Sequence, residues 1–185
     1  LGLDSGKTFG LVELLYPLLI ESSNDSAEVL SHFLGKERTV KKMNEKAKMI
    51  LMENTSFADP TGYDPENVST TKDLFYLARY IVNNRPPIFK ITKNEKVNSY
   101  GPIRFQNLIS KNFFFENQEF VGGKTGYIKT SAHTGLFVFK LAMPDGAKRD
   151  IVIILLGSTG EVENSPKNLE RDANDVLFWL KENYF

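Results

Sequence analysis

The chain has 185 residues, and its 23 basic and 23 acidic side chains give a formal net charge of zero. A hydrophobic share of 41% is enough for a core in one domain, or in one domain with two lobes. The neutral balance argues against a nucleic-acid partner, because phosphate binding needs a basic excess or a basic face. Cysteine is absent and His32 and His133 are far apart, so we expect no disulfide, no metal and no cofactor.

Capping residues and apolar residues at helical spacing predict that the first half of the chain is helical. The expected helices cover residues 8–19, 24–34, 39–50 and 70–85. Pro17 lies inside the first of them and is expected to bend or divide it. Pro86 and Pro87 are expected to end the fourth, and residues from Ile88 to about Phe120 to be irregular with short possible strands.

The last third of the chain changes to strand patterns. Residues 120–127, 135–143 and 150–157 predict strands, and the turn residues Pro144, Asp145 and Gly146 join the second to the third. A closing helix is expected from about Ser165 to Glu182. Helices and strands that are segregated in this way favour an α+β fold, with helices packed on an antiparallel sheet.

One short segment carries the clearest chemical signal. Lys124-Thr125-Gly126-Tyr127 follows Gly122 and Gly123 on a predicted strand. The lysine charge and the threonine hydroxyl suit a substrate carboxylate, and we expect the glycines to let a substrate lie against the backbone. A backbone N–H of such a strand can point at a developing oxyanion.

A second polar segment, Ser22-Ser23-Asn24-Asp25, lies about a hundred residues upstream in the helical region. A serine hydroxyl and an asparagine amide close together can relay a proton and hold a substrate amide. The two segments together predict acyl transfer on a substrate with a free C-terminal carboxylate. What they lack is a nucleophile with its base.

Ser22-x-Asn24 and Lys124-Thr125-Gly126 resemble the second and third motifs of the penicillin-binding proteins and serine β-lactamases. The sequence is most similar to the low-molecular-mass D-alanyl-D-alanine carboxypeptidases, peptidase family S11. The resemblance extends, in the same order, over residues 14–25, 43–47, 54–62, 69–74, 157–158 and 171.

This resemblance implies a fold and a reaction. The fold is a three-layer α/β/α arrangement of the penicillin-binding-protein type, in which residues 1–185 form a single partial transpeptidase-like domain. A helical lobe with cleft loops is expected at about 8–119, and strands with a closing helix at about 120–185. The implied reaction removes the terminal D-alanine of peptidoglycan stem peptides through an acyl-enzyme, and β-lactams would acylate the same serine.

The resemblance also implies roles for the residues of the third motif. Lys124 and Thr125 would bind the terminal carboxylate of D-alanine, and Gly126 would leave room for substrate along the strand edge. The backbone N–H of Tyr127 would form half of the oxyanion hole. Many family members place a further basic residue shortly before this motif, and Arg104 is the nearest candidate, with a surface charge as the equal alternative.

Ser22 and Asn24 would be catalytic: Ser22 would assist proton transfer, and Asn24 would hydrogen-bond the substrate amide. The family's first motif, Ser-x-x-Lys, carries the nucleophile and general base and comes before these residues. None of the 21 residues preceding Ser22 forms it. The literal match Ser69-Thr70-Thr71-Lys72 comes after the second motif, where we expect Ser69 or Thr70 to cap a helix instead.

Two explanations for the missing motif remain open. In the first, the chain is a fragment whose N-terminal part is missing, and the start at Leu1 in mid-domain favours this explanation. In the second, the protein is a relative that lost catalysis and kept binding. A fragment would expose a sheet edge and an apolar helix face, so we expect self-association or a covering N-terminal segment.

The alternative functions are a β-lactamase of the same fold and a non-catalytic peptidoglycan- or partner-binding protein. Because peptidoglycan lies outside the cytoplasmic membrane, the intact protein is expected to be exported to the cell envelope, in the periplasm or on the outer face of that membrane.

Overall fold

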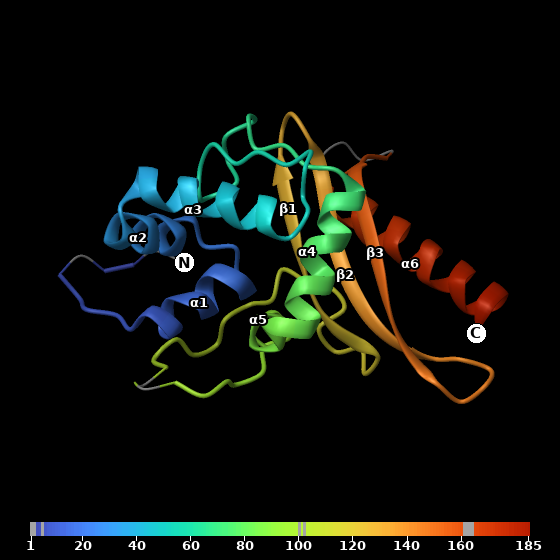
Figure 1. The fold of residues 1–185 in the computed structure, drawn as a ribbon. Coiled ribbons are helices and arrows are strands. Elements are labelled where there is room, and N and C mark those ends of the chain that lie inside the picture. Colours follow the sequence, from blue (N-terminus) through green and yellow to red (C-terminus); the bar gives the residue numbers. More distant parts are fainter. Residues whose placement is uncertain (1–2, 5, 100, 102, 161–164) are drawn as a thin grey trace.

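A three-stranded antiparallel sheet lies at the centre of the computed structural model, which describes residues 3–4, 6–99, 101, 103–160 and 165–185. Its strands β1 (Phe120–Ile128), β2 (Ala132–Ala142) and β3 (Lys148–Ser158) pair in the order β1-β2-β3. The sequence predicted each of the three strands to within three residues. Figure 1 shows the two hairpins that connect them.

Both faces of the sheet are covered by helices, because alternate strand residues point to opposite sides. Phe137 and Phe139 pack with Leu169 and Leu177 of α6 (Pro166–Tyr184) on one face. On the other face, Leu136 and other residues of β2 and β3 pack against α4 (Thr71–Asn84) and α5 (Pro86–Thr92). The predicted three-layer α/β/α arrangement is therefore confirmed (Figure 1).

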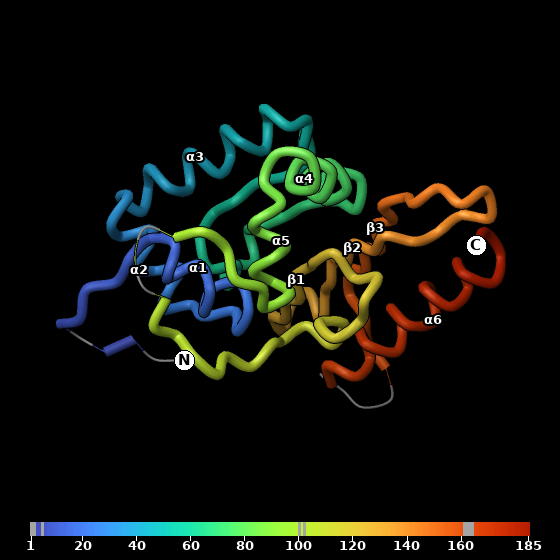
Figure 2. Tube along the Cα trace, turned by 90° about the horizontal axis from the view of Figure 1, so that it is seen from below, coloured from blue at the N-terminus to red at the C-terminus, as the bar shows by residue number. Residues whose placement is uncertain are grey.

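The helical lobe consists of α1 (Leu11–Ile20), α2 (Asn24–Leu34) and α3 (Lys36–Met49). Figure 2 shows that these three helices lie on the side of β1 that faces away from β2 and β3. The first and third helices differ from the prediction at their starts, since α1 begins after Gly10 and α3 begins directly after Gly35. Gly35 has a φ of +86°, a conformation that favours glycine, so the chain reverses there without a linker.

Helix α5 was missed by the sequence prediction, which expected an irregular segment after the two prolines. Pro86 ends α4 but also occupies the first position of α5, where a missing N–H costs nothing. Phe89 and Ile91 are buried, and Phe89 packs against the sheet beside β1. Between Lys93 and Glu119 the described residues contain turns and coil but no strand, so the short strands expected there are not present.

In the part of the chain that the structure describes, none of the helices is long and apolar enough to cross a membrane.

Candidate active site

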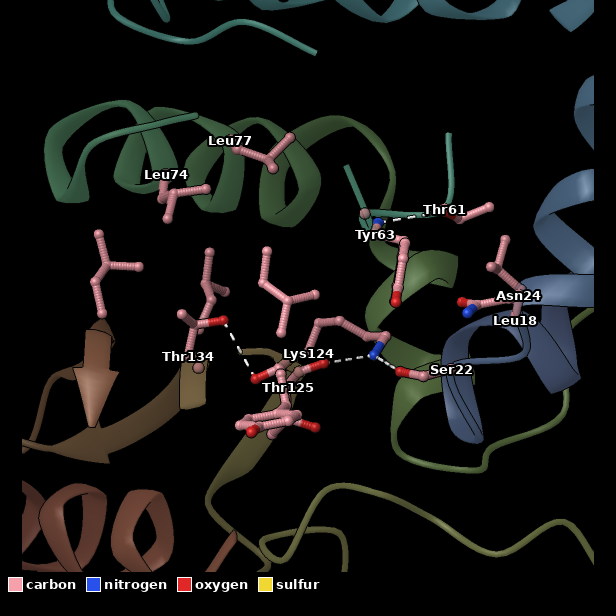
Figure 3. A pocket seen from close by; sticks show the side chains of 17 residues that line it. Leu18, Ser22, Asn24, Thr61, Tyr63, Leu74, Leu77, Lys124, Thr125 and Thr134 are labelled. Atoms are coloured by element: carbon pink, nitrogen blue, oxygen red, sulfur yellow. Dashed lines mark hydrogen bonds between the residues drawn. The ribbon is translucent and has the colours of Figure 1, made fainter. Parts of the chain in front are cut away.

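Two segments that are far apart in sequence meet where the helical lobe faces β1. The Nζ of Lys124 donates a hydrogen bond to the Oγ of Ser22, 102 residues away, and a second to the carbonyl of Thr125 at 2.7 Å. Figure 3 shows the lysine reaching from the strand toward the helical lobe. The second and third sequence motifs therefore meet in one site.

Ser22 owes its position to the sharp turn between α1 and α2. The Ser23 N–H donates to the Pro17 carbonyl at 3.1 Å, and the Ser23 side chain caps α2 by accepting from Ser26 N. Ser22 itself has a φ of +57°, a left-handed conformation that is uncommon for a residue other than glycine. Such strained residues concentrate at functional sites, where the surrounding structure holds them.

Asn24 begins α2, so the turn that places Ser22 also places the amide of Asn24. Both side chains are exposed and line one cavity of about 550 Å³ together with Lys124 and Thr125. The expected catalytic and carboxylate-binding groups therefore surround a common space.

Burial lowers the pKa of Lys124 to about 8, because the ammonium loses contact with water as it crosses the cavity wall. At neutral pH most of the lysine is still charged. Because little water solvates the Lys124 ammonium, keeping it charged costs free energy. For the same reason the ammonium attracts an anionic ligand strongly.

The edge of β1 that faces the helical lobe offers backbone donors to a ligand. The Gly123 N–H donates to the Oγ1 of Thr92 in α5 at 3.0 Å, so it points away from β2. Alternate residues of an antiparallel strand point to the same side, which directs the N–H groups of Thr125 and Tyr127 to that edge as well. This is the orientation that an oxyanion donor at Tyr127 requires.

The glycines of β1 do not all serve the ligand. A Cβ on Gly122 would lie 2.3 Å from the Cβ of Phe89, and one on Gly123 would lie 2.3 Å from the Leu136 carbonyl oxygen. These two glycines are buried and allow α5 and β2 to approach, so the expectation that they accommodate a substrate is wrong. Gly126 is exposed and lines the cavity, as expected of a glycine beside a ligand.

The apolar side of the cavity and a loop on its far wall complete the site. Leucines from four elements contribute, namely Leu18, Leu74, Leu77, Leu136 and Leu156. Across from β1, Thr61, Gly62 and Tyr63 of the loop that follows α3 form the wall (Figure 3). The sequence assigned no role to this loop.

A second lysine, Lys111, lies beside Thr125. The Thr125 hydroxyl donates to the backbone carbonyl of Lys111 at 3.2 Å. Lys111 and Thr125 line a cavity of about 290 Å³ that Ser22 also borders. Lys111 was missed because its proximity to Thr125 depends on the fold of the preceding irregular segment.

Arg104 does not take part in this site. Its guanidinium donates to the buried carboxylate of Glu13 at 2.8 and 2.9 Å and to the Thr8 carbonyl, which ties α1 to the segment before β1. The expectation that Arg104 binds a substrate carboxylate is therefore wrong, because this side chain forms a structural ion pair with Glu13.

The Ser69-Thr70-Thr71-Lys72 segment serves a structural purpose. The Thr70 side chain accepts from Asp73 N and caps α4, which confirms the expected helix start. The Ser69 hydroxyl hydrogen-bonds Thr55, and Lys72 is exposed, with its Nζ 6.0 Å from the centre of the Tyr76 ring.

Among the described residues, no group of three or more His, Cys, Asp or Glu side chains is arranged to hold a metal ion.

Comparison with known proteins agrees with this architecture. The family model for D-alanyl-D-alanine carboxypeptidases matches residues 2–152, so the chain belongs to the D-alanyl-D-alanine carboxypeptidase family.

Individual relatives extend the similarity to nearly the whole chain. D-alanyl-D-alanine carboxypeptidase DacB2 of Mycobacterium tuberculosis is 30% identical over 166 residues, which are 86% of this chain and 55% of the relative. Penicillin-binding protein D2 of Listeria monocytogenes in its cefotaxime-bound form superposes with a TM-score of 0.76 at 26% identity, covering 94% of this chain and 67% of that one.

A crystal structure of a D-alanyl-D-alanine carboxypeptidase from Mycobacterium tuberculosis gives a TM-score of 0.75 at 26% identity, covering 99% of this chain and 69% of that one. The chain thus has the penicillin-binding-protein fold, and it spans about half the length of the curated relatives that it matches.

Proposed function

We propose that this chain is the substrate-binding part of a serine-type D-Ala-D-Ala carboxypeptidase that acts on peptidoglycan stem peptides in the cell envelope. The observation that carries the proposal is the convergence of Ser22, Asn24, Lys124 and Thr125 on one cavity beside the open edge of β1. The family to which the chain belongs supports the same reaction class.

In this mechanism the Lys124 ammonium and the Thr125 hydroxyl bind the terminal carboxylate, and Lys111, which lines the adjoining cavity with Thr125, adds positive potential. The peptide pairs with the edge of β1, and the Tyr127 N–H donates to the carbonyl oxygen as negative charge develops there. Asn24 holds the substrate amide.

A serine hydroxyl attacks the penultimate D-alanyl carbonyl, its proton passes to the leaving amine, and D-alanine departs to leave an acyl ester. Water then hydrolyses the ester. Ser22 assists the proton transfer rather than attacking, a role that follows from its place in the second motif, and its hydrogen bond from Lys124 connects it to a group that can carry a proton. The nucleophile belongs to a Ser-x-x-Lys pair that would join this site from outside the present 185 residues. β-Lactams would acylate that serine.

The experiment has two parts. The 185-residue chain is incubated with fluorescent penicillin, and no covalent labelling is expected because Ser22 is not a nucleophile. The same chain joined to a Ser-x-x-Lys segment from its own gene should label with the penicillin and release D-alanine from a D-Ala-D-Ala peptide.

Each outcome discriminates between functions. A joined protein that labels but does not release D-alanine, and that turns over penicillin rapidly, would favour the β-lactamase. A joined protein that binds the peptide without labelling would favour the non-catalytic binding protein. Labelling of the 185-residue chain that disappears in Ser22→Ala would assign the nucleophile to Ser22 and contradict the proposed roles.

A further inference from the structure

Tyr63 lies in the site although none of the motifs contains it. Its side chain is 75% exposed and lines the same cavity as Ser22, Asn24 and Lys124. Figure 3 shows the phenol ring pointing from the loop into the cavity, with its hydroxyl end directed toward the Lys124–Ser22 pair. A tyrosine in this position presents both an apolar ring and a hydrogen-bonding hydroxyl to any ligand of the cavity.

The loop that carries Tyr63 is held by one carboxylate. Asp59 accepts hydrogen bonds from the backbone N–H groups of Thr61 at 2.9 Å, Gly62 at 3.1 Å and Asp64 at 3.2 Å, and from the side chains of Thr61 and Asn67. Burial alone would raise the pKa of Asp59, but these hydrogen bonds outweigh it and lower the pKa to about 2. At neutral pH the carboxylate is ionised and fixes the turn on both sides of Tyr63.

The base of the loop is fixed as well. Ser56 and Val68 pair through two backbone hydrogen bonds of 3.0 and 2.9 Å, which close the loop. The Asn44 side chain, on α3, exchanges two hydrogen bonds with the backbone of Phe57 at 2.8 and 2.9 Å. The backbone position of Tyr63 is therefore set before a ligand arrives, which lowers the entropy cost of using this residue for recognition.

The loop faces the strand that would hold a ligand. Gly62 and Asn67 line a further cavity of about 430 Å³ together with Gly126 and Tyr127 of β1. A peptide that lies against the edge of β1 would consequently have this loop on its other side. The side of the peptide that faces away from β1 would meet Tyr63.

We propose that Tyr63 is a specificity residue that contacts the alanyl side chains of the bound peptide, an inference that rests on the proposed function. The ring covers a methyl group of the D-alanyl-D-alanine end, and the hydroxyl donates a hydrogen bond to a peptide oxygen. Asp59 is a positioning residue that acts through the loop.

The experiment follows binding by NMR titration of the 185-residue chain with two probes, acetyl-D-alanyl-D-alanine and acetyl-glycyl-glycine. Tyr63→Phe should weaken both peptides by about fivefold, the size of one neutral hydrogen bond. Tyr63→Ala should in addition bring the two affinities close together, because the surface that distinguishes a methyl group from hydrogen is gone. Tyr184→Phe and Tyr184→Ala, at an exposed tyrosine on α6, are the matched controls and should change neither affinity.

Stability measurements distinguish a variant that disturbs the loop from a variant that only loses its contact with the peptide. Both Tyr63 variants should keep the wild-type melting temperature and the wild-type NMR signals of residues 56–68, since the side chain is largely exposed. Asp59→Asn should lower the melting temperature and reduce the preference for the alanyl peptide together.

The outcomes separate this inference from the proposed function. If Tyr63→Ala retains the full preference for the alanyl peptide while Lys124→Ala still weakens binding, Tyr63 is not a specificity residue and the proposed function stands. If the wild-type chain binds neither probe, the proposed function fails and this inference fails with it.

Discussion

At the scale of single residues, Lys124 has the largest effect on what the site can hold. Its ammonium is satisfied by two internal oxygens, the Ser22 hydroxyl and the Thr125 carbonyl. A carboxylate entering the cavity can replace a neutral acceptor with a charged one, and charge-assisted hydrogen bonds are about twice as strong as neutral ones. The resting site is therefore stable without a ligand and still gains energy from an anion.

Removing this charge should weaken peptide binding. Lys124→Ala is expected to reduce the binding free energy of acetyl-D-alanyl-D-alanine by roughly 1.5–3 kcal/mol, the range for a hydrogen bond to a charged group. Calorimetric or NMR titration of the 185-residue chain measures it. Lys140→Ala, at an exposed ion pair on β2, is the control, and equal affinities for the two variants would remove Lys124 from the site.

The lowered pKa of Lys124 makes binding depend on pH. Because its pKa is about 8, the ammonium becomes a neutral amine as the pH rises from about 7 to 9, and affinity for the carboxylate should fall across that interval. A bound carboxylate stabilises the charged form, so the fall should move to higher pH as the peptide concentration increases. In Lys124→Arg, which stays charged, a persistent pH dependence would contradict this explanation.

At the scale of elements, the approach of α5 to β1 depends on the absence of a side chain at Gly122. Gly122→Ala would place a Cβ 2.3 Å from the Cβ of Phe89, closer than real contacts allow, and Gly122 has a φ of +159°. We expect a loss of about 1–3 kcal/mol in unfolding free energy, as for other overpacked cores. Urea denaturation measures it, and Gly101→Ala, which meets no atom within 4 Å, should be nearly neutral.

The attachment of α1 to the segment before β1 depends on the charge of Glu13. The side-chain hydrogen bond from Arg104 holds the pKa of Glu13 at about 2, below its ordinary value of 4.5. The folded chain then binds fewer protons than the unfolded chain, so the free energy of unfolding should be fully maintained above about pH 4.5 and fall as the pH drops toward about 2.

Denaturation at pH 6 and pH 3 tests the role of Glu13. The wild type should lose stability between these two values, and Glu13→Gln should be less stable at pH 6 by about 1.5–3 kcal/mol with a shallower dependence on pH. An unchanged slope in Glu13→Gln would assign the acid sensitivity to other carboxylates, with Asp59 the first to consider.

The elements that the sequence predicted well are those whose signals are local. Thr70 caps α4, and short apolar runs bounded by turn residues mark β2 and β3, so these segments were recognised from their own residues. Helix α5 was missed because two prolines signal both an end and a beginning. Whether a proline begins a new helix depends on what its apolar side chains can pack against, and for Phe89 that partner is a strand about thirty residues later.

The candidate site shows the same difference between residues with a local sequence signal and residues whose position depends on the fold. Ser22, Asn24 and the residues of β1 were predicted because their spacing resembles motifs of a known family. Tyr63 and Lys111 were missed because each lies in a loop, and only the packing of that loop brings it to β1. Gly122 and Gly123 were misinterpreted because a glycine that admits a ligand and a glycine that admits a neighbouring helix are identical in sequence.

At the scale of the whole molecule, β3 pairs only with β2 within the described residues, and Phe178 and Trp179 of α6 are 66% and 53% exposed. An open strand edge and an apolar helix surface favour association with another chain or segment. We expect the 185-residue chain to self-associate at high concentration, as measured by light scattering.

Substitutions should distinguish the two surfaces. Trp179→Glu should reduce the association if the helix contributes, and Leu156→Lys should reduce it if the edge of β3 contributes. A monodisperse 21.0 kDa monomer at all concentrations would refute the expectation of self-association.

The hydrogen bond from Gly123 to Thr92 also sets a limit on the substrate. A peptide adding to β1 as an extra strand can use the N–H groups of Tyr127 and Thr125, but the next one inward is already taken by α5. New backbone pairing along this edge is therefore available at Thr125 and Tyr127 and ends at Gly123. Helix α5 thus closes one end of the β1 edge, and a peptide that pairs there as we propose would have to stop or turn away at α5.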